Sequence, residues 1–187
     1  MTVEVPRVPL FARPFYFLRH GETEANVLRI VAGSRDVPLT ELGHVQAREA
    51  AALLAGRGIT AICSSALQRA RQTARYVAEA LELPVTIVPE LGERNWGALE
   101  GRPRDLCLAG VTPPGGETEE EFSSRVLRGF ARVEPEGLPL IVSHSGVFRV
   151  LCRVLGVEPP GERIENARPV LCLPPDARSP IWRLELL

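Results

Sequence analysis

Short apolar segments alternate with longer stretches of helical periodicity along this chain. The segments 15–18, 59–63, 85–88 and 138–142 are apolar and rich in strand-forming residues. Apolar side chains at helical spacing mark stripes within about 40–54, after Ser65, after Thr118 and after 142. This alternation is typical of an α/β domain whose strands are mostly parallel.

Two helix starts have capping-box spacing, Ser65 with Gln68 and Thr118 with Glu121. Segments 170–173 and 181–187 predict two late strands, which we expect at sheet edges because prolines surround them. The chain has no internal repeat and no break in composition, so we expect residues 1–187 to form a single domain.

Composition narrows the possible chemistry. All 22 basic residues are arginine, which excludes mechanisms that need a lysine amine. Only three acids are aspartate, so a paired-aspartate magnesium site is not expected. The formal net charge of −1 provides no global basic field, so we expect neither nucleic acid nor a membrane as partner, and any anion site must be local.

The four cysteines are widely spaced without a C-x-x-C pair, and the chain has three histidines. We therefore expect no zinc site, no disulfide framework and no cofactor. Met1–Pro14 has no apolar run typical of a signal peptide, and no stretch is long and apolar enough to span a membrane. These features predict a cytoplasmic protein with reduced thiols.

Two histidines follow predicted strands at the same structural position. His20 comes after the first strand and His144 after the fourth. In an open parallel sheet, ligands bind at the carboxyl ends of strands, so both imidazoles should meet in one crevice with Arg19 and Arg69. A histidine after a strand is by itself more often a hydrogen-bonded structural residue. Together, two imidazoles and two guanidiniums predict a pocket for a phosphoryl group, and the arginines favour neutral, nucleophilic imidazole.

Several ordered motifs resemble those of the histidine phosphatase superfamily, the phosphoglycerate mutase-like proteins. The segment 19–26 resembles the R-H-G-[EQ]-[ST]-x-x-N signature of this family. Similar blocks follow in family order at 38–43, 64–74, 91–101, 115–118 and 142–146. The resemblance implies a phosphoglycerate mutase-like fold, a three-layer α/β/α sandwich around a mostly parallel sheet.

The same resemblance implies roles for individual residues. His20 would be the nucleophile that becomes a phosphohistidine, and Glu93 would protonate the leaving oxygen and then activate water. The other candidates would bind the phosphoryl oxygens or line the substrate side: Arg19, Arg69 and His144 for the former, and Thr23, Asn26 and Ser145 for the latter. Phosphoryl transfer needs mainly alignment and charge neutralisation, which these groups can supply without a metal ion.

The family contains both phosphatases and mutases. The stretch 102–114, which follows the acidic loop, is only thirteen residues long, whereas mutases tend to have a longer cover over the substrate. We therefore expect a metal-independent phosphomonoesterase acting on a small phosphorylated substrate, with mutase-type transfer within a small acid as the alternative. A phosphate-binding sensor without turnover and a metal-dependent hydrolase that uses His20, His144 and glutamates are two further hypotheses.

Overall fold

The computed structural model describes residues 8–108, 110–133, 137–161, 164–177 and 179–187. Residues 1–7, half of the segment Met1–Pro14, fall outside these ranges, and with them the prediction about a signal peptide. The strands are β1 (Phe15–Arg19), β2 (Ala61–Ser64), β3 (Val85–Ile87), β4 (Pro139–Ser143), β5 (Pro169–Leu173) and β6 (Arg183–Leu186). The α-helices are α1 (Glu24–Val27), α2 (Glu41–Leu54), α3 (Gln68–Leu81), α4 (Glu119–Ala131) and α5 (Ser145–Leu155).

Four short 3-10 helices lie in the connections. They are η1 (Pro9–Ala12), η2 (Pro89–Leu91), η3 (Gly97–Leu99) and η4 (Arg104–Leu106). Three of them interrupt the long segment between β3 and α4, which the sequence predicts to be mostly loop. That segment supplies one wall of the cavity described below.

The six strands form one sheet in the order β3-β2-β4-β1-β5-β6. The pairs β1–β4, β2–β4 and β2–β3 are parallel, whereas β1–β5 and β5–β6 are antiparallel. The expected α/β fold with a mostly parallel sheet is therefore confirmed. Because β1 and β4 are neighbours, and Arg19 stands opposite Ser143, the residues that follow these strands emerge side by side.

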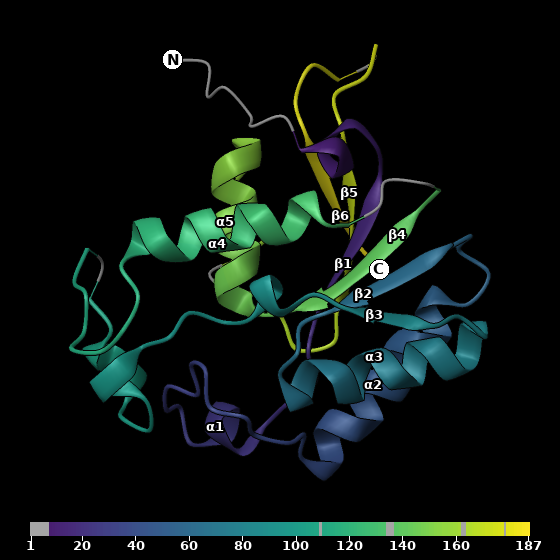
Figure 1. Cartoon of the computed structure of the whole chain (residues 1–187). Helices are drawn as coiled ribbons and strands as arrows, with labels where there is room; N and C mark the ends of the chain where they lie inside the picture. Colours follow the sequence, from purple (N-terminus) through teal and green to yellow (C-terminus); the bar gives the residue numbers. More distant parts are fainter. Residues whose placement is uncertain (1–7, 109, 134–136, 162–163, 178) are drawn as a thin grey trace.

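Helices cover both faces of the sheet, α4 and α5 on one and α2 and α3 on the other (Figure 1). The alternation of side chains along β1 shows why the sheet must be covered twice. Phe15 and Phe17 pack into the core beneath α4 and α5, while Tyr16 and Leu18 pack into the core beneath α2 and α3. The expected three-layer sandwich follows from strands that are apolar on both faces.

The predicted helices and strands all occur, and no boundary is shifted by more than three residues. The capping box at Thr118 is confirmed, because its side chain accepts a hydrogen bond from the backbone N–H of Glu121. The capping box at Ser65 is wrong, because α3 begins at Gln68 after Leu67, and the carboxylate of Asp36 accepts the backbone N–H of Gln68 instead. The hydroxyl of Ser65 instead contacts His144 at 2.8 Å.

The edge prediction for the two late strands is half wrong. β6 lies at the edge of the sheet, but β5 lies between β1 and β6. Pro169 begins β5, a position where the missing N–H of proline is tolerated, so the strand can pair on both sides. Among the described residues, no helix has the length and apolar character that crossing a membrane requires.

Tight backbone packing holds the turn after β1. A Cβ atom on Gly21 would overlap the carbonyl oxygen of Gly43, and a Cβ atom on Gly43 would overlap the carbonyl oxygen of Glu22. The N–H of Gly21 also donates to the hydroxyl of Thr73 on α3 at 3.0 Å. The two glycines let α2 and α3 clamp the loop that carries His20.

Candidate active site

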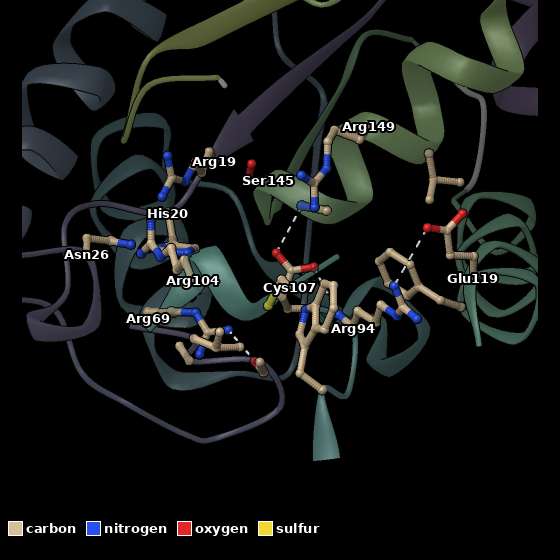
Figure 2. A pocket seen from close by; sticks show the side chains of 18 of the residues that line it. Arg19, His20, Asn26, Arg69, Arg94, Arg104, Cys107, Glu119, Ser145 and Arg149 are labelled. Atoms are coloured by element: carbon tan, nitrogen blue, oxygen red, sulfur yellow. Dashed lines mark hydrogen bonds and ion pairs between the residues drawn. The ribbon is translucent and has the colours of Figure 1, made fainter. Parts of the chain in front are cut away.

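A cavity of about 330 Å³ opens at the carboxyl ends of β1 and β4 (Figure 2). Seven of the eight residues that the sequence singles out line this cavity, and they come from four separate parts of the chain. They are Arg19, His20, Thr23, Asn26, Arg69, Glu93 and Ser145. The eighth, His144, is not among the lining residues, but its ring centroid lies 5.2 Å from that of His20.

His20 is buried at the end of β1 with a defined orientation. Its backbone N–H donates to the carbonyl of Ser143 at 3.0 Å, which extends the pairing of β1 with β4 by one residue. Its Nδ1 lies 2.7 Å from the carbonyl oxygen of Gly21. Since a carbonyl only accepts, Nδ1 carries the proton and Nε2 keeps its lone pair.

The environment of His20 also favours the neutral ring. Burial lowers the pKa of His20 well below its ordinary value, and the positive charges of Arg69 and Arg19 lower it further. Neutral imidazole with a free lone pair is a nucleophile. The site thus supplies the reactive form of His20 at neutral pH.

Two guanidiniums flank this imidazole, and backbone carbonyls hold both. Arg19 donates to the carbonyl of Ile164 at 2.8 Å. Arg69, in the first turn of α3, donates to the carbonyls of Arg35 and Gly33, each at 2.8 Å. Its buried Nε–H has no hydrogen-bond partner among the described residues. These carbonyl acceptors orient the two guanidiniums beside His20, and their positive charges attract an anionic ligand.

His144 lies at the start of α5 and is fully buried. Its Nε2 is 2.8 Å from the hydroxyl oxygen of Ser65, and its Nδ1 has no hydrogen-bond partner among the described residues. Burial lowers the pKa of His144 well below its usual value, followed by the charge of Arg69 and the neighbouring His20. A neutral ring that accepts from Ser65 through Nε2 would keep its proton on Nδ1.

Glu93 is fixed beside the first turn of α5. Its Oε2 accepts the backbone N–H of Gly146 at 2.9 Å, and its Oε1 accepts the backbone N–H of Arg94 at 2.9 Å. A Cβ atom at position 146 would overlap this carboxyl group, so the glycine is required for the contact. The carboxyl group lines the same cavity as His20, as a group that exchanges protons with a bound ester must.

Asn26 has a fixed amide orientation. Its Oδ1 accepts from the backbone N–H of Thr23 at 3.0 Å and from the Nδ2 of Asn166 at 3.1 Å. Asn166 also donates to the backbone carbonyl of His20 at 2.8 Å. The oxygen of Asn26 is thus occupied, so its amino group is the part that can donate into the cavity.

Sequence reasoning did not assign several residues that shape this cavity. Asn166 stands outside every recognised motif, and nothing in its sequence surroundings indicates a role. Trp96 and Cys107 also line the cavity, and so do four further arginines: Arg94, Arg104, Arg149 and Arg153. A surplus of arginine over acid in the segments that follow Glu93 and His144 is the only signal that could have pointed to them.

The described residues include no cluster of three or more histidine, cysteine, aspartate or glutamate side chains able to hold a metal ion. The charges that act on His20 are those of Arg69, Arg19 and Arg104. The arrangement can bind a compact dianion, present a nucleophilic nitrogen to it, and exchange a proton through a carboxyl group.

A comparison with protein families decides the classification. The model of the histidine phosphatase superfamily (branch 1) matches residues 15–168. The chain belongs to this superfamily. Among curated proteins, the Yersinia pestis protein named "Probable phosphoglycerate mutase GpmB" is 36% identical over 166 residues, which cover 79% of this chain and 77% of the relative.

Solved structures of the superfamily show the same fold. The α-ribazole phosphatase from Shigella flexneri has 32% identity and a TM-score of 0.78, covering 93% of this chain and 95% of its own. A mycobacterial glucosyl-3-phosphoglycerate phosphatase, solved in complex with VO3, has 27% identity and a TM-score of 0.76, covering 93% and 97%. The similar proteins therefore carry the names of phosphatases and of a mutase.

Proposed function

We propose that this protein is a metal-independent phosphomonoesterase that hydrolyses a small phosphorylated metabolite through a phosphohistidine on His20. One observation carries the proposal: the Nδ1 of His20 is held by the Gly21 carbonyl at 2.7 Å, in a cavity that Arg19 and Arg69 line. The ring therefore keeps Nε2 as its nucleophilic atom, next to the charges that attract a phosphoryl group.

In the first half-reaction, the Nε2 lone pair forms a bond to phosphorus while the bond between phosphorus and the ester oxygen breaks. Glu93, in its protonated form, gives its proton to the departing oxygen, so an alcohol leaves. The guanidiniums of Arg19 and Arg69 neutralise charge on the non-bridging oxygens, and the backbone holds both before substrate arrives.

In the second half-reaction, water attacks the phosphohistidine. The ionised Glu93 accepts a proton from the water as the new phosphorus–oxygen bond forms and the bond to Nε2 breaks. His20 returns to neutral imidazole, Glu93 to its protonated form, and inorganic phosphate leaves. The backbone N–H groups of Arg94 and Gly146 hold the carboxyl group in one place through both halves.

His144 supports the phosphoryl group rather than attacking it. Its Nε2 is occupied by Ser65, which leaves the Nδ1–H as the donor for a phosphoryl oxygen. Burial lowers the pKa of His144, and the charge of Arg69 and the neighbouring His20 lower it further, so this donor is a neutral imidazole.

Phosphoglycerate mutase activity is the second candidate, and the curated Yersinia relative favours it. The two reactions share the phosphohistidine and differ in what receives the phosphoryl group. The short stretch 102–114 favours water, because a short cover leaves the intermediate open to solvent.

A substrate panel tests the proposal. Phosphate release from p-nitrophenyl phosphate and from small sugar and acid phosphates should proceed in excess EDTA, and vanadate should inhibit it. The mycobacterial neighbour solved with VO3 supports that last expectation. Conversion of 3-phosphoglycerate to 2-phosphoglycerate without phosphate release would replace the proposal with the mutase. Activity that EDTA abolishes and a divalent ion restores would replace it with a metal-dependent hydrolase.

A further inference from the structure

The cavity carries more positive charge than one phosphoryl group requires. Its lining includes six arginines and two glutamates. Arg19 and Arg69 lie beside His20, at the reacting end. The outer end, away from His20, contains Arg94, Arg149 and Glu119 (Figure 2), and Arg153 lies 3.9 Å from the Glu119 carboxylate.

Glu119 is already shared at the outer end. Its Oε1 lies 4.0 Å from Arg94 and its Oε2 lies 3.9 Å from Arg153. The same Oε1 accepts the backbone N–H of Gly110 at 3.2 Å. Arg94 is itself buried and donates to the carbonyl of Glu117. None of these contacts involves Arg149, and the other carboxylate of the cavity, Glu93, accepts the backbone N–H groups of Arg94 and Gly146.

Arg149 has no hydrogen bond or ion pair with another described residue. It is exposed on the second turn of α5, and its guanidinium extends into the cavity near Ser145 (Figure 2). Arg153 follows one turn further along the same face of α5, with 64% of its side chain exposed. A planar guanidinium with unused donors is suited to bind a carboxylate or phosphate in a bidentate manner.

Arg149 lies close to the group that is proposed to protonate the leaving oxygen. Glu93, the proposed proton donor to the leaving oxygen, is hydrogen-bonded to Gly146 in the first turn of α5. Arg149 stands three residues later, about one helical turn of roughly 5.4 Å. A leaving group that extends from Glu93 along α5 would therefore contact Arg149 first and Arg153 after it.

We propose that the leaving group of the substrate carries a second anionic group, a carboxylate or phosphate, which Arg149 binds with support from Arg153. The substrate class is thus the phosphomonoesters of anionic alcohols. This inference rests on the proposed phosphomonoesterase activity and specifies its substrate. Binding of the second anion is a simple ion-pairing step and transfers no group.

Matched substrate pairs test the subsite. We expect a higher kcat/KM for 3-phosphoglycerate than for glycerol 3-phosphate, or for 1,3-propanediol bisphosphate than for its monophosphate. The first pair tests a carboxylate, the second a phosphate. Arg149→Gln should reduce this preference by about 10- to 100-fold, the range for a hydrogen bond to a charged group. Arg153→Gln should reduce it less, because solvent screens its charge.

The control variant is Arg128→Gln. Arg128 is exposed on α4 and does not line the cavity, so the change removes the same charge elsewhere. It should leave the preference unchanged. Arg149→Lys should restore part of the preference, since the charge remains while the planar fork is lost.

A binding experiment separates this inference from the proposed activity. Calorimetry with 3-phosphonopropionate and propylphosphonate compares an anionic with a neutral tail and needs no turnover. Tighter binding of the anionic tail that Arg149→Gln abolishes supports the subsite, even if no ester is hydrolysed. Equal affinities and equal kcat/KM values within each pair would overturn it, as would an equal loss for both members in Arg149→Gln. Failure to release phosphate from any ester of the panel would refute the proposed function alone.

Discussion

The two ends of the cavity are built in different ways. At the reacting end, Arg19, His20 and Arg69 are at most 7% exposed, and backbone carbonyls fix each of them. At the outer end, Arg149 and Arg153 are exposed on α5. Among the described residues, the one ion pair that either arginine makes is the long contact of Arg153 with Glu119.

This difference separates the reaction from the choice of substrate. Every residue type carries a backbone carbonyl, so a side-chain substitution does not remove the groups that hold the reacting end. Exposed side chains on a helix can be exchanged at little cost in stability. The superfamily neighbours carry names with different substrates on one fold, which is consistent with this division.

Replacing the nucleophile His20 should have the largest effect on turnover. A small effect would contradict the assignment of the reaction to this end of the cavity. His20→Ala should lower kcat by roughly 10⁴-fold or more, because the covalent relay is lost. Steady-state phosphate release from p-nitrophenyl phosphate measures this. The matched control is His44→Ala. His44 lies on α2, contacts Tyr76 of α3 and does not line the cavity. Near-normal turnover by His20→Ala would remove it from the mechanism.

The second largest effect is expected for Arg69→Lys, which should reduce kcat/KM by about 10²- to 10³-fold. Lysine keeps the positive charge but loses the two directed hydrogen bonds to the carbonyls of Arg35 and Gly33. Arg71→Lys, on an exposed position of the same helix, is its control. Both variants should be compared at equal fraction folded, measured by circular dichroism. Equal behaviour of the two would show that burial of Arg69 serves stability alone.

Glu93→Gln tests whether Glu93 transfers a proton to the leaving group. It should slow hydrolysis of alkyl phosphates by roughly 100-fold, the usual contribution of a general acid. The effect on p-nitrophenyl phosphate should be smaller, because nitrophenolate leaves without a proton. The ratio of the two kcat values measures this difference. An identical loss with both esters would assign Glu93 to positioning α5 through Gly146 rather than to proton transfer.

The smallest expected effect is that of acid on the free energy of unfolding, through His20 and His144. Burial and the charge of Arg69 lower the pKa of His20 and His144 in the folded chain. Below about pH 6.5 the unfolded chain gains protons that the folded chain does not, so the free energy of unfolding falls as pH drops from there toward the folded pKa values. Each histidine can contribute up to about 1.4 kcal/mol per pH unit.

Thermal unfolding between about pH 7.5 and about pH 5.5 measures this effect, and the window follows from the ordinary histidine pKa. The drop in Tm should be smaller for His20→Gln than for the natural sequence. A Tm that rises on acidification, or a drop that the substitution leaves unchanged, would show that His20 does not resist protonation.

The sequence predicts the reacting end well because local signals there agree. β1 and β4 are short apolar runs, and the residues after them come together as parallel neighbours. The two missed features depend on tertiary contacts. Ser65 looks like a helix cap but its hydroxyl lies beside His144, and β5 looks like an edge strand but gains a partner on each side. No periodicity encodes such distant contacts.

The outer end could not be predicted in the same way. Arg149 and Arg153 have the spacing of ordinary exposed residues on an amphipathic helix, and α5 does bury the opposite face. Only the position of α5 beside Glu93 gives them a possible role. Asn166 likewise acquires its contacts with Asn26 and His20 only through the fold.

Trapping of the covalent intermediate tests the central claim most directly. The protein is mixed with ³²P-labelled substrate, quenched in alkali within one turnover, and digested for mass spectrometry. The account predicts one phosphoryl group, stable to base and labile to acid, on the peptide that contains His20, and none in His20→Ala. Label on another residue, or full turnover with no labelled protein at any time, would contradict it.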